Sequence, residues 1–198
     1  MLIYSHQVTE TVAVVTEPIT TAYAKSHLRV DITDDDTLIA NLVTAARQYT
    51  EIFCARSFGQ HTYRADLWDF ADLMKLPLGP VQSIESIKYR DTASPSVLQT
   101  LATTVYAKNK DSIVREYGQS WPSINSRFDA VQVTFKTGYS DLASPEDTIA
   151  NVPEGVKSAM LLLIGDLYEN RESQQLYPGQ ILESRSFKML LNTYRKYR

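Results

Sequence analysis

Residues 152–172 read VPEGVKSAMLLLIGDLYENRE, and this stretch decides the fold. Pro153 fixes φ near the helical value, and its missing N–H costs nothing in a first turn, where Glu154 also faces the positive end of the helix dipole. Apolar residues then recur at helical spacing in one stripe: Val156, Ala159, Met160, Leu163, Ile164 and Leu167. Leu161, Leu162 and Tyr168 flank that stripe. A helix that is apolar this far round is predicted to be covered on more than one side, by a bundle or by a neighbouring subunit.

A second helix is predicted over about residues 34–54. Thr33 precedes three consecutive aspartates, a pattern typical of an N-cap followed by a first turn in which the dipole favours negative charge. The predicted buried stripe is Leu38, Ile39, Leu42, Ala46, Tyr49 and Phe53, and the opposite face is Asn41, Thr44, Arg47, Gln48 and Glu51. This helix is therefore expected to pack on the helix that begins near Pro153. A shorter helix, with Thr20 as its N-cap, is expected before it.

Between these helices the apolar period changes to two. Tyr63, Ala65 and Leu67 alternate with polar residues, as do Val131, Val133 and Phe135. Helices at both ends of the chain and strands between them predict an α+β fold, in which a helical core carries an inserted small antiparallel β-sheet and an extended C-terminal tail. The predicted segments are 1–58 (first part of the helical core), 59–140 (β region), 141–172 (second core helix) and 173–198 (basic tail).

Composition and charge exclude several classes of protein. The chain has 198 residues, of which 43% are hydrophobic and 22% charged, as in an ordinary soluble domain. A net charge of −3 argues against electrostatic binding of nucleic acid by the chain as a whole. The longest apolar run, 159–164, is far too short to span a membrane. The first ten residues do not resemble a signal peptide, so we expect a protein made and kept in a cytoplasm.

No pattern of catalytic or metal-binding residues stands out. Counted from Asp31, the sixth and twelfth positions of a calcium loop hold Asp36 and Leu42 instead of Gly and Glu, so the aspartates are better explained as a helix start. The single cysteine, Cys54, excludes an intrachain disulfide and is expected to be a buried structural thiol. Neither a phosphate-binding loop nor a G-x-S-x-G motif occurs. We therefore predict no catalytic residue, metal or cofactor, and a protein that is not an enzyme.

The C-terminal tail is basic and amphipathic. From residue 185 onward its charges are all positive: Arg185, Lys188, Arg195, Lys196 and Arg198. In a helix its apolar residues would share the other face: Phe187, Leu190, Leu191, Tyr194 and Tyr197. A helix of about 12 residues is marginal alone in water, so this one needs a surface to fold on. Docking on an acidic protein groove is favoured over packing on its own domain, and both over binding nucleic acid or a membrane surface.

Several segments, in this order and spacing, resemble the head–tail connector (adaptor or head-completion) family of tailed bacteriophages. The matching segments are 17–20 (EPIT) with 24–30, 34–39 with 45–47, 76–84 (LPLGPVQSI), 131–139, and 152–154 with 161–172. One position departs from the family, which often has Thr-Gly-Arg after the second helix where this chain has Cys54-Ala55-Arg56. Glycine caps a helix in the left-handed region more readily than Ala55 does, so a different turn is expected here.

The resemblance implies a structural virion protein of the phage neck. About a dozen copies would form a ring that joins the capsid portal to the tail or stopper and extends the channel, and such a ring needs a heterologous interface. DNA would pass through this channel without sequence-specific binding. The protein is expected in the virion, and in the host cytoplasm during assembly, with no membrane partner. Two alternatives stay open: another neck or tail-completion protein, such as a tail terminator, and a free-standing nucleic-acid-binding module that uses the basic tail.

Two sets of residues are predicted to carry the assembly contacts. The subunit interface is assigned to Leu161, Leu162, Tyr168 and Arg171. The second set is the tail, which would become ordered on binding the portal or a neighbouring subunit. Its docking residues are Arg185, Phe187, Lys188, Leu190, Leu191, Tyr194, Arg195, Lys196, Tyr197 and Arg198.

Overall fold

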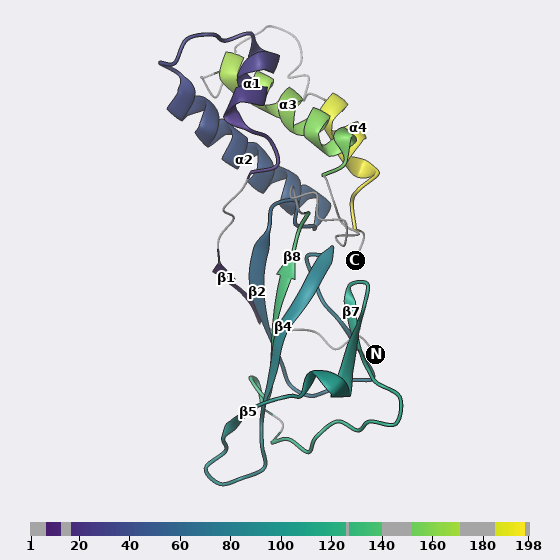
Figure 1. The fold of residues 1–198 in the computed structure, drawn as a ribbon. Coiled ribbons are helices and arrows are strands. Elements are labelled where there is room, and N and C mark those ends of the chain that lie inside the picture. The colour runs from purple at the N-terminus through teal and green to yellow at the C-terminus, as the bar shows by residue number, and fades with distance from the viewer. Residues whose placement is uncertain (1–6, 13–16, 126, 140–151, 171–184, 197–198) are drawn as a thin grey trace, which may run out of the picture. The chain divides into compact units, whose positions relative to one another are not determined.

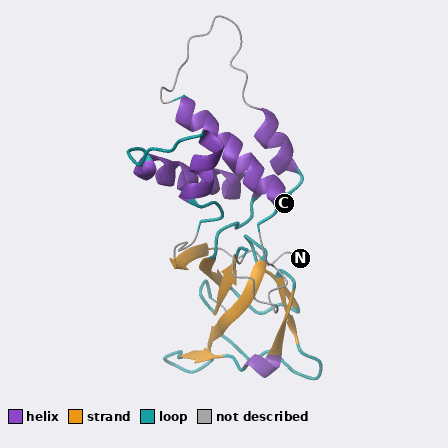
Figure 2. Cartoon of the chain, turned by 45° about the horizontal axis from the view of Figure 1, so that its top comes forward, coloured by secondary structure: helices purple, strands orange, loops and turns teal. Residues whose placement is uncertain are grey.

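The computed structural model describes residues 7–12, 17–125, 127–139, 152–170 and 185–196, which fall into two units (Figures 1 and 2). The helical unit comprises Thr16–Gly59 and Ser140–Arg198, and the sheet unit comprises Met1–Val15 and Gln60–Tyr139. The α+β class predicted from the sequence is confirmed, with helices towards both ends of the chain and antiparallel strands between them. Each unit is described by itself.

Helix α3 is the central element of the helical unit. The unit contains α1 (Thr21–Leu28), α2 (Asp36–Cys54), α3 (Glu154–Glu169) and α4 (Arg185–Asn192), and α3 packs against each of the other three. Helix α3 contributes five buried residues to the core: Val156, Ala159, Met160, Leu161 and Ile164. Helices of the same chain therefore cover most of the apolar surface of α3, but Leu162 is exposed, and so is Leu167, which was predicted to lie in the buried stripe.

Asp35 and Asp36, at the start of α2, also make contacts with other helices of the unit. Helix α2 begins at Asp36, and its N-cap is Asp35, which makes no side-chain capping hydrogen bond. The prediction of Thr33 as N-cap was therefore wrong by two residues. Lys25 Nζ pairs with Asp36 Oδ1, and Tyr168 Oη donates to Asp35 Oδ2 at 2.6 Å. These bonds hold the turn between α1 and α2 against α1 itself and against the last turn of α3.

The buried face of α2 is rotated relative to the predicted stripe. The buried residues of α2 are Ile39, Val43, Ala46, Arg47, Thr50 and Cys54. Tyr49, predicted to be buried, is exposed, whereas Arg47, predicted on the polar face, is buried. The burial of Arg47 has an electrostatic explanation, because two half-buried carboxylates, Glu17 and Glu51, pair with its guanidinium. A pattern that scores arginine as polar cannot anticipate such a paired burial.

The turn after α2 has the left-handed geometry that the sequence argued against. Ala55 has φ 52° and ψ 42°, its N–H donates to the carbonyl of Ile52, and the N–H of Arg56 donates to the carbonyl of Glu51. This pair of bonds is a Schellman motif. The expectation of a different turn was therefore wrong, and the alanine accepts a conformation that ordinarily favours glycine. Arg29 ends α1 in the same way, with φ 57°.

The sheet unit closes one core between two antiparallel sheets. The larger sheet has the order β1 (Gln7–Val12), β2 (His61–Leu67), β8 (Val131–Thr137), β4 (Val81–Arg90) and β5 (Leu98–Thr100). The smaller sheet has the order β3 (Leu73–Lys75), β7 (Ser112–Arg115) and β6 (Tyr106–Asn109). In the register of the larger sheet, Val133 of β8 lies between Ala65 and Ile87. Met74, Tyr106 and Ile113 of the smaller sheet join the same core as these residues.

Candidate functional site

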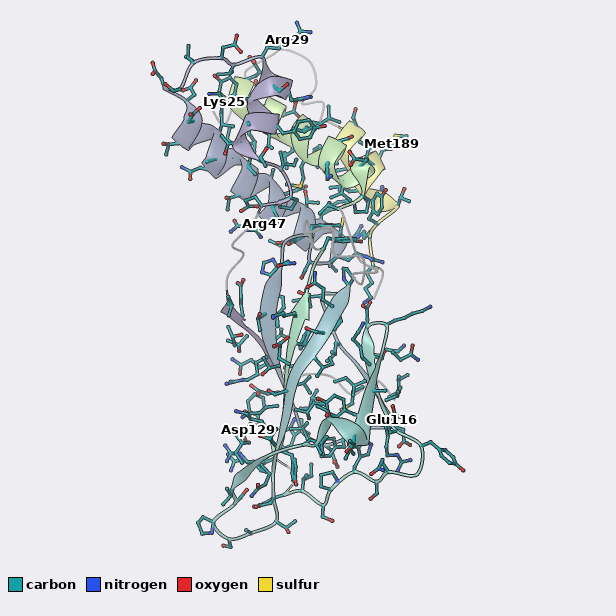
Figure 3. The ribbon with its side chains drawn as sticks, viewed as in Figure 1. Lys25, Arg29, Arg47, Glu116, Asp129 and Met189 are labelled. Carbon is teal, nitrogen blue, oxygen red and sulfur yellow. The ribbon has the colours of Figure 1, made fainter. Side chains whose placement is uncertain are left out.

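The helical unit carries opposite charges at its two ends. The acidic end combines the α1–α2 turn with the last turn of α3, and its carboxylates are Asp31, Asp34, Asp35, Asp36, Asp166 and Glu169. The basic end combines the end of α2 with α4 and the residues after it, and its cations include Lys188, Arg195 and Lys196. The acidic end also holds two cations, Lys25 and Arg29, which are labelled in Figure 3, and Met189 lies at the other end of the same unit.

The tail packs on its own unit. Phe187 and Leu191, two of the predicted docking residues, are buried, and Leu191 has no exposed surface. Phe187 meets Tyr49 of α2 edge to face, with 5.7 Å between ring centroids. The alternative ranked second from the sequence, packing of the tail on its own domain, describes α4. Phe187 and Leu191 are consequently parts of the core, and only the outer face of α4 can meet a partner.

The residues after α4 are fixed at the C-terminal end of α2. The guanidinium carbon of Arg195 lies 5.1 Å from the centre of the Phe53 ring, and the backbone N–H of Lys196 donates to the Cys54 carbonyl at 2.9 Å. Cations are favoured there because the helix dipole is negative at its C-terminal end. The structure therefore brings Arg195 and Lys196 together on α2.

The four predicted interface residues have different environments. Leu161 is buried within its own unit, because α3 is surrounded by the other helices, and it has little surface left for a neighbour. Leu162 is 36% exposed, and Tyr168 is half-buried in its hydrogen bond to Asp35. Arg171 lies outside the described residues, as do Tyr197, Arg198 and the side chain of Arg185. Of the three that the structure describes, Leu162 offers the most apolar surface to a partner.

A hollow of about 460 Å³ lies between the first turn of α3 and α4. It is lined by Gly155, Ser186, Met189, Leu190, Thr193 and Tyr194. Gly155 permits the close approach of α4, because a Cβ at this position would lie 2.9 Å from the Tyr194 hydroxyl oxygen. Met189 is 76% exposed beside the hollow. Met189 was not among the residues predicted from the sequence, because it lies outside the apolar stripe of the tail. An apolar residue on the otherwise polar face of this helix could have indicated an exposed contact residue.

A buried ion-pair network supports the helical unit. Arg47 Nε donates to Glu17 Oε2 and Arg47 Nη1 donates to Glu51 Oε2, each at 2.7 Å. The second oxygen of Glu51 accepts the backbone N–H groups of Phe58 and Gly59. Burial acts to lower the pKa of Arg47, but its bonds to Glu17 and Glu51 outweigh burial and raise that pKa, so the guanidinium stays charged. The network thus links the segment before α1, which contains Glu17, to the segment after α2, which contains Phe58 and Gly59.

Cys54 is a free, buried cysteine at the end of α2. Burial raises the pKa of the Cys54 thiol to about 11, so it remains protonated and unreactive near neutral pH. Within the described ranges, no three or more His, Cys, Asp or Glu side chains gather in a way that could hold a metal ion. None of the described helices is long and apolar enough to cross a membrane.

The chain belongs to the phage gp6-like head–tail connector family, whose model matches residues 19–115, from just before α1 to the end of β7. It is therefore a structural connector protein and not an enzyme, as the resemblance implied.

Solved structures from gene transfer agent (GTA) particles share this fold. Each comparison has 20% sequence identity and covers 97% of this chain and 96% of the other chain. The TM-scores are 0.73 for a chain in the neck of an empty GTA particle with C6 symmetry, 0.72 for one in the virion of a native GTA particle, and 0.70 for one in the neck of a native particle with C12 symmetry. No curated protein matches the chain.

Proposed function

We propose that this protein forms a closed ring in the virion neck, between the capsid portal and the tail or stopper. The match to the head–tail connector family carries this proposal. The similar fold of chains in neck assemblies with C6 and C12 symmetry supports a ring of about a dozen copies, since a heterologous contact closes into a ring when its rotation allows. The net charge of −3 suits a channel through which DNA slides without sequence-specific binding.

Helix α4 takes part in this assembly through its outer face. Phe187 and Leu191 hold α4 on its own unit, which leaves Met189 and Leu190 exposed towards a partner. A helix that is already folded loses less conformational entropy on docking than a disordered tail would lose. The tail therefore acts as a prepared surface for the portal or for a neighbouring subunit.

The oligomeric state of the purified full-length protein tests the ring. We expect native mass measurements and negative-stain images to show closed rings. When labelled protein is incorporated into particles, we expect the label at the portal vertex. A protein that is monomeric at every soluble concentration would overturn self-driven ring formation. Salt-dependent DNA binding that disappears when Arg195 and Lys196 are changed to Ala would instead support the nucleic-acid-binding alternative.

A further inference from the structure

The polar face of the larger sheet carries a regular set of hydrogen-bond donors. Because side chains alternate along a strand, the neighbours of the core residues Ala65, Val133 and Ile87 point away from the core. Successive cross-strand rows on this outward face are Asp66–Gln132–Lys88 and Arg64–Thr134–Ser86, and the next row contains Lys136. All these residues are polar, and all except the carboxylate can donate a hydrogen bond.

The carboxylates of these rows are offset locally by cations. Asp66 is 2% exposed, and Arg64 Nη2 donates to its Oδ2 at 3.2 Å. Glu85 lies at a bulge of β4, and its Oε1 is 3.4 Å from Lys136 Nζ. Lys88, in contrast, is exposed and has no ion-pair partner among the described residues. The rows therefore carry an excess of positive charge at Lys88.

A second excess of positive charge lies at the end of β4. Arg90, two residues beyond Lys88 and on the same face, donates two hydrogen bonds to Oδ2 of Asp129 (labelled in Figure 3), and Arg127 donates one to Oδ1. A guanidinium has five N–H donors, so both arginines keep donors for a further anion. Three cations with one carboxylate give this cluster a net charge of +2, on a chain whose net charge is −3.

We propose that this face binds the phosphate backbone of duplex DNA without reading its sequence, with Lys88, Arg90 and Arg127 as the main contacts. The inference rests on the proposed function, in which a neck ring surrounds the path of the DNA, and it names the surface that meets the DNA. Arginine, lysine, serine, threonine and glutamine side chains are the usual donors to phosphate oxygens. Contacts to the backbone alone allow a protein and DNA to slide past each other.

The composition of the rows favours DNA over a protein partner. Protein interfaces depend on a few apolar or aromatic anchors that fill pockets, with Trp, Tyr and Arg most frequent among them. The two complete rows, in contrast, contain no apolar side chain, and their exposed charges are positive. Duplex DNA also carries one negative charge per about 1.7 Å of its axis, a density that an acidic peptide does not reach.

Duplex DNA binding by charge-neutralised variants tests this surface. Fluorescence anisotropy of a short labelled duplex measures the affinity of the full-length protein between about 50 and 200 mM salt. The double variant Lys88→Gln, Arg127→Gln removes two cations and leaves Arg90 bound to Asp129. We expect the slope of log affinity against log salt to become shallower by about two, so that the wild type loses roughly tenfold more affinity than the variant over this range.

A second pair of exposed lysines provides the matched control. Lys75 lies in β3 and Lys110 lies between β6 and β7, both outside the larger sheet. The double variant Lys75→Gln, Lys110→Gln makes the same change in net charge and should leave the salt slope unchanged. Far-UV circular dichroism and melting temperatures like those of the wild type establish that each variant is folded.

The outcomes separate this surface from the tail, from a protein partner and from the ring. The proposal is overturned if the wild type does not bind DNA at about 50 mM salt, or if the Lys88 and Arg127 variant keeps the wild-type slope. It is also overturned if only Arg195→Ala with Lys196→Ala abolishes binding, or if poly-glutamate of equal charge competes as well as DNA. Native mass measurements score the ring independently. A wild-type protein that forms no ring but shows the expected slopes overturns the ring and supports the DNA-binding surface.

Discussion

The helical unit and the sheet unit are built from the chain in different ways. Of the eight strands that the structure describes in the sheet unit, seven come from residues 60–139, and both its sheets contribute to one core. The helical unit gathers three separate described segments, 17–59, 152–170 and 185–196, around α3. Both units depend on contacts between segments far apart in the sequence, as the pairing of β2 with β8 shows for the sheet unit. They differ in continuity, because the sheet unit is nearly one stretch of chain whereas residues 60–139 interrupt the helical unit.

The two units can be followed by different signals. Both tryptophans of the chain, Trp68 and Trp121, lie in the sheet unit, so intrinsic tryptophan fluorescence reports on that unit. The α-helices lie in the helical unit, which therefore dominates the circular dichroism signal at 222 nm. Variants can accordingly be assigned to one unit by comparing the two unfolding curves.

The largest effect is expected from Arg47→Met in the helical unit. This substitution removes the cation but keeps much of the volume, and it leaves Glu17 and Glu51 without their buried partner. We expect the free energy of unfolding to fall by about 3–5 kcal/mol, the usual cost of breaking a buried pair. Urea unfolding at 222 nm measures the loss, and the tryptophan curve should move less.

Arg47→Lys separates charge from geometry in this network. Lysine keeps the positive charge but cannot donate to two carboxylates in the fixed planar geometry of a guanidinium. We expect an intermediate loss of stability. Equal stability for Arg47→Met and the wild type would show that the ion pairs contribute nothing net.

A second large effect concerns the packing of the tail. Leu191→Ala removes a fully buried side chain from α4, and we expect a loss of about 2–4 kcal/mol from the transfer and cavity terms together. The neighbouring Leu190→Ala is the control, because Leu190 is exposed and should cost less than about 0.5 kcal/mol. Urea unfolding at 222 nm distinguishes the two. Equal, small losses would mean that α4 does not contribute to the stability of its unit.

Much of the architecture was predictable because it depends on local signals. The period of two from Tyr63 to Leu67 predicted β2, and the period in 152–172 predicted α3 with its start at Pro153. The environment of single side chains was not predictable in the same way. Arg47 is buried with two partners, Glu51 one turn along α2 and Glu17, which lies 30 residues earlier in the chain. Periodicity along one helix carries no information about such a distant partner.

The contact surfaces were the least predictable part. The amphipathic tail was recognised, but the sequence could not say whether its apolar face would meet its own unit or another protein, since both satisfy the same pattern. The structure places Phe187 and Leu191 inside and Met189 outside.

A smaller, pH-dependent effect is expected in the sheet unit. Arg90 donates two hydrogen bonds to one oxygen of Asp129, and Arg127 donates one to the other oxygen. The bonds from Arg90, with a further contribution from Arg127, hold the pKa of Asp129 below its usual value. Asp129→Asn should lower the stability of this unit at pH 7 by about 1–2 kcal/mol, measured by tryptophan fluorescence during urea unfolding.

The sign of the pH dependence follows from this lowered pKa. The contribution of Asp129 is fully present above the unfolded-state pKa of about 4 and is lost as the pH falls through the folded-state pKa. The stability difference between wild type and Asp129→Asn should therefore stay constant from pH 7 to pH 5 and shrink below about pH 4. A difference that persists unchanged in acid would mean that packing, and not charge, stabilises this site.

The smallest effect should be a gain of stability at the end of α2. Ala55 occupies the left-handed region, where a Cβ is unfavourable, so Ala55→Gly should stabilise the helical unit by about 0.5–1 kcal/mol after the entropy cost of glycine is subtracted. Ala45→Gly, at an exposed position inside the same helix, should instead lower stability by about 0.5–1 kcal/mol. Both are measured by thermal unfolding at 222 nm. If Ala55→Gly raises stability and Ala45→Gly lowers it, backbone conformation decides the effect of the same substitution. If both variants lose stability, Ala55 is not strained.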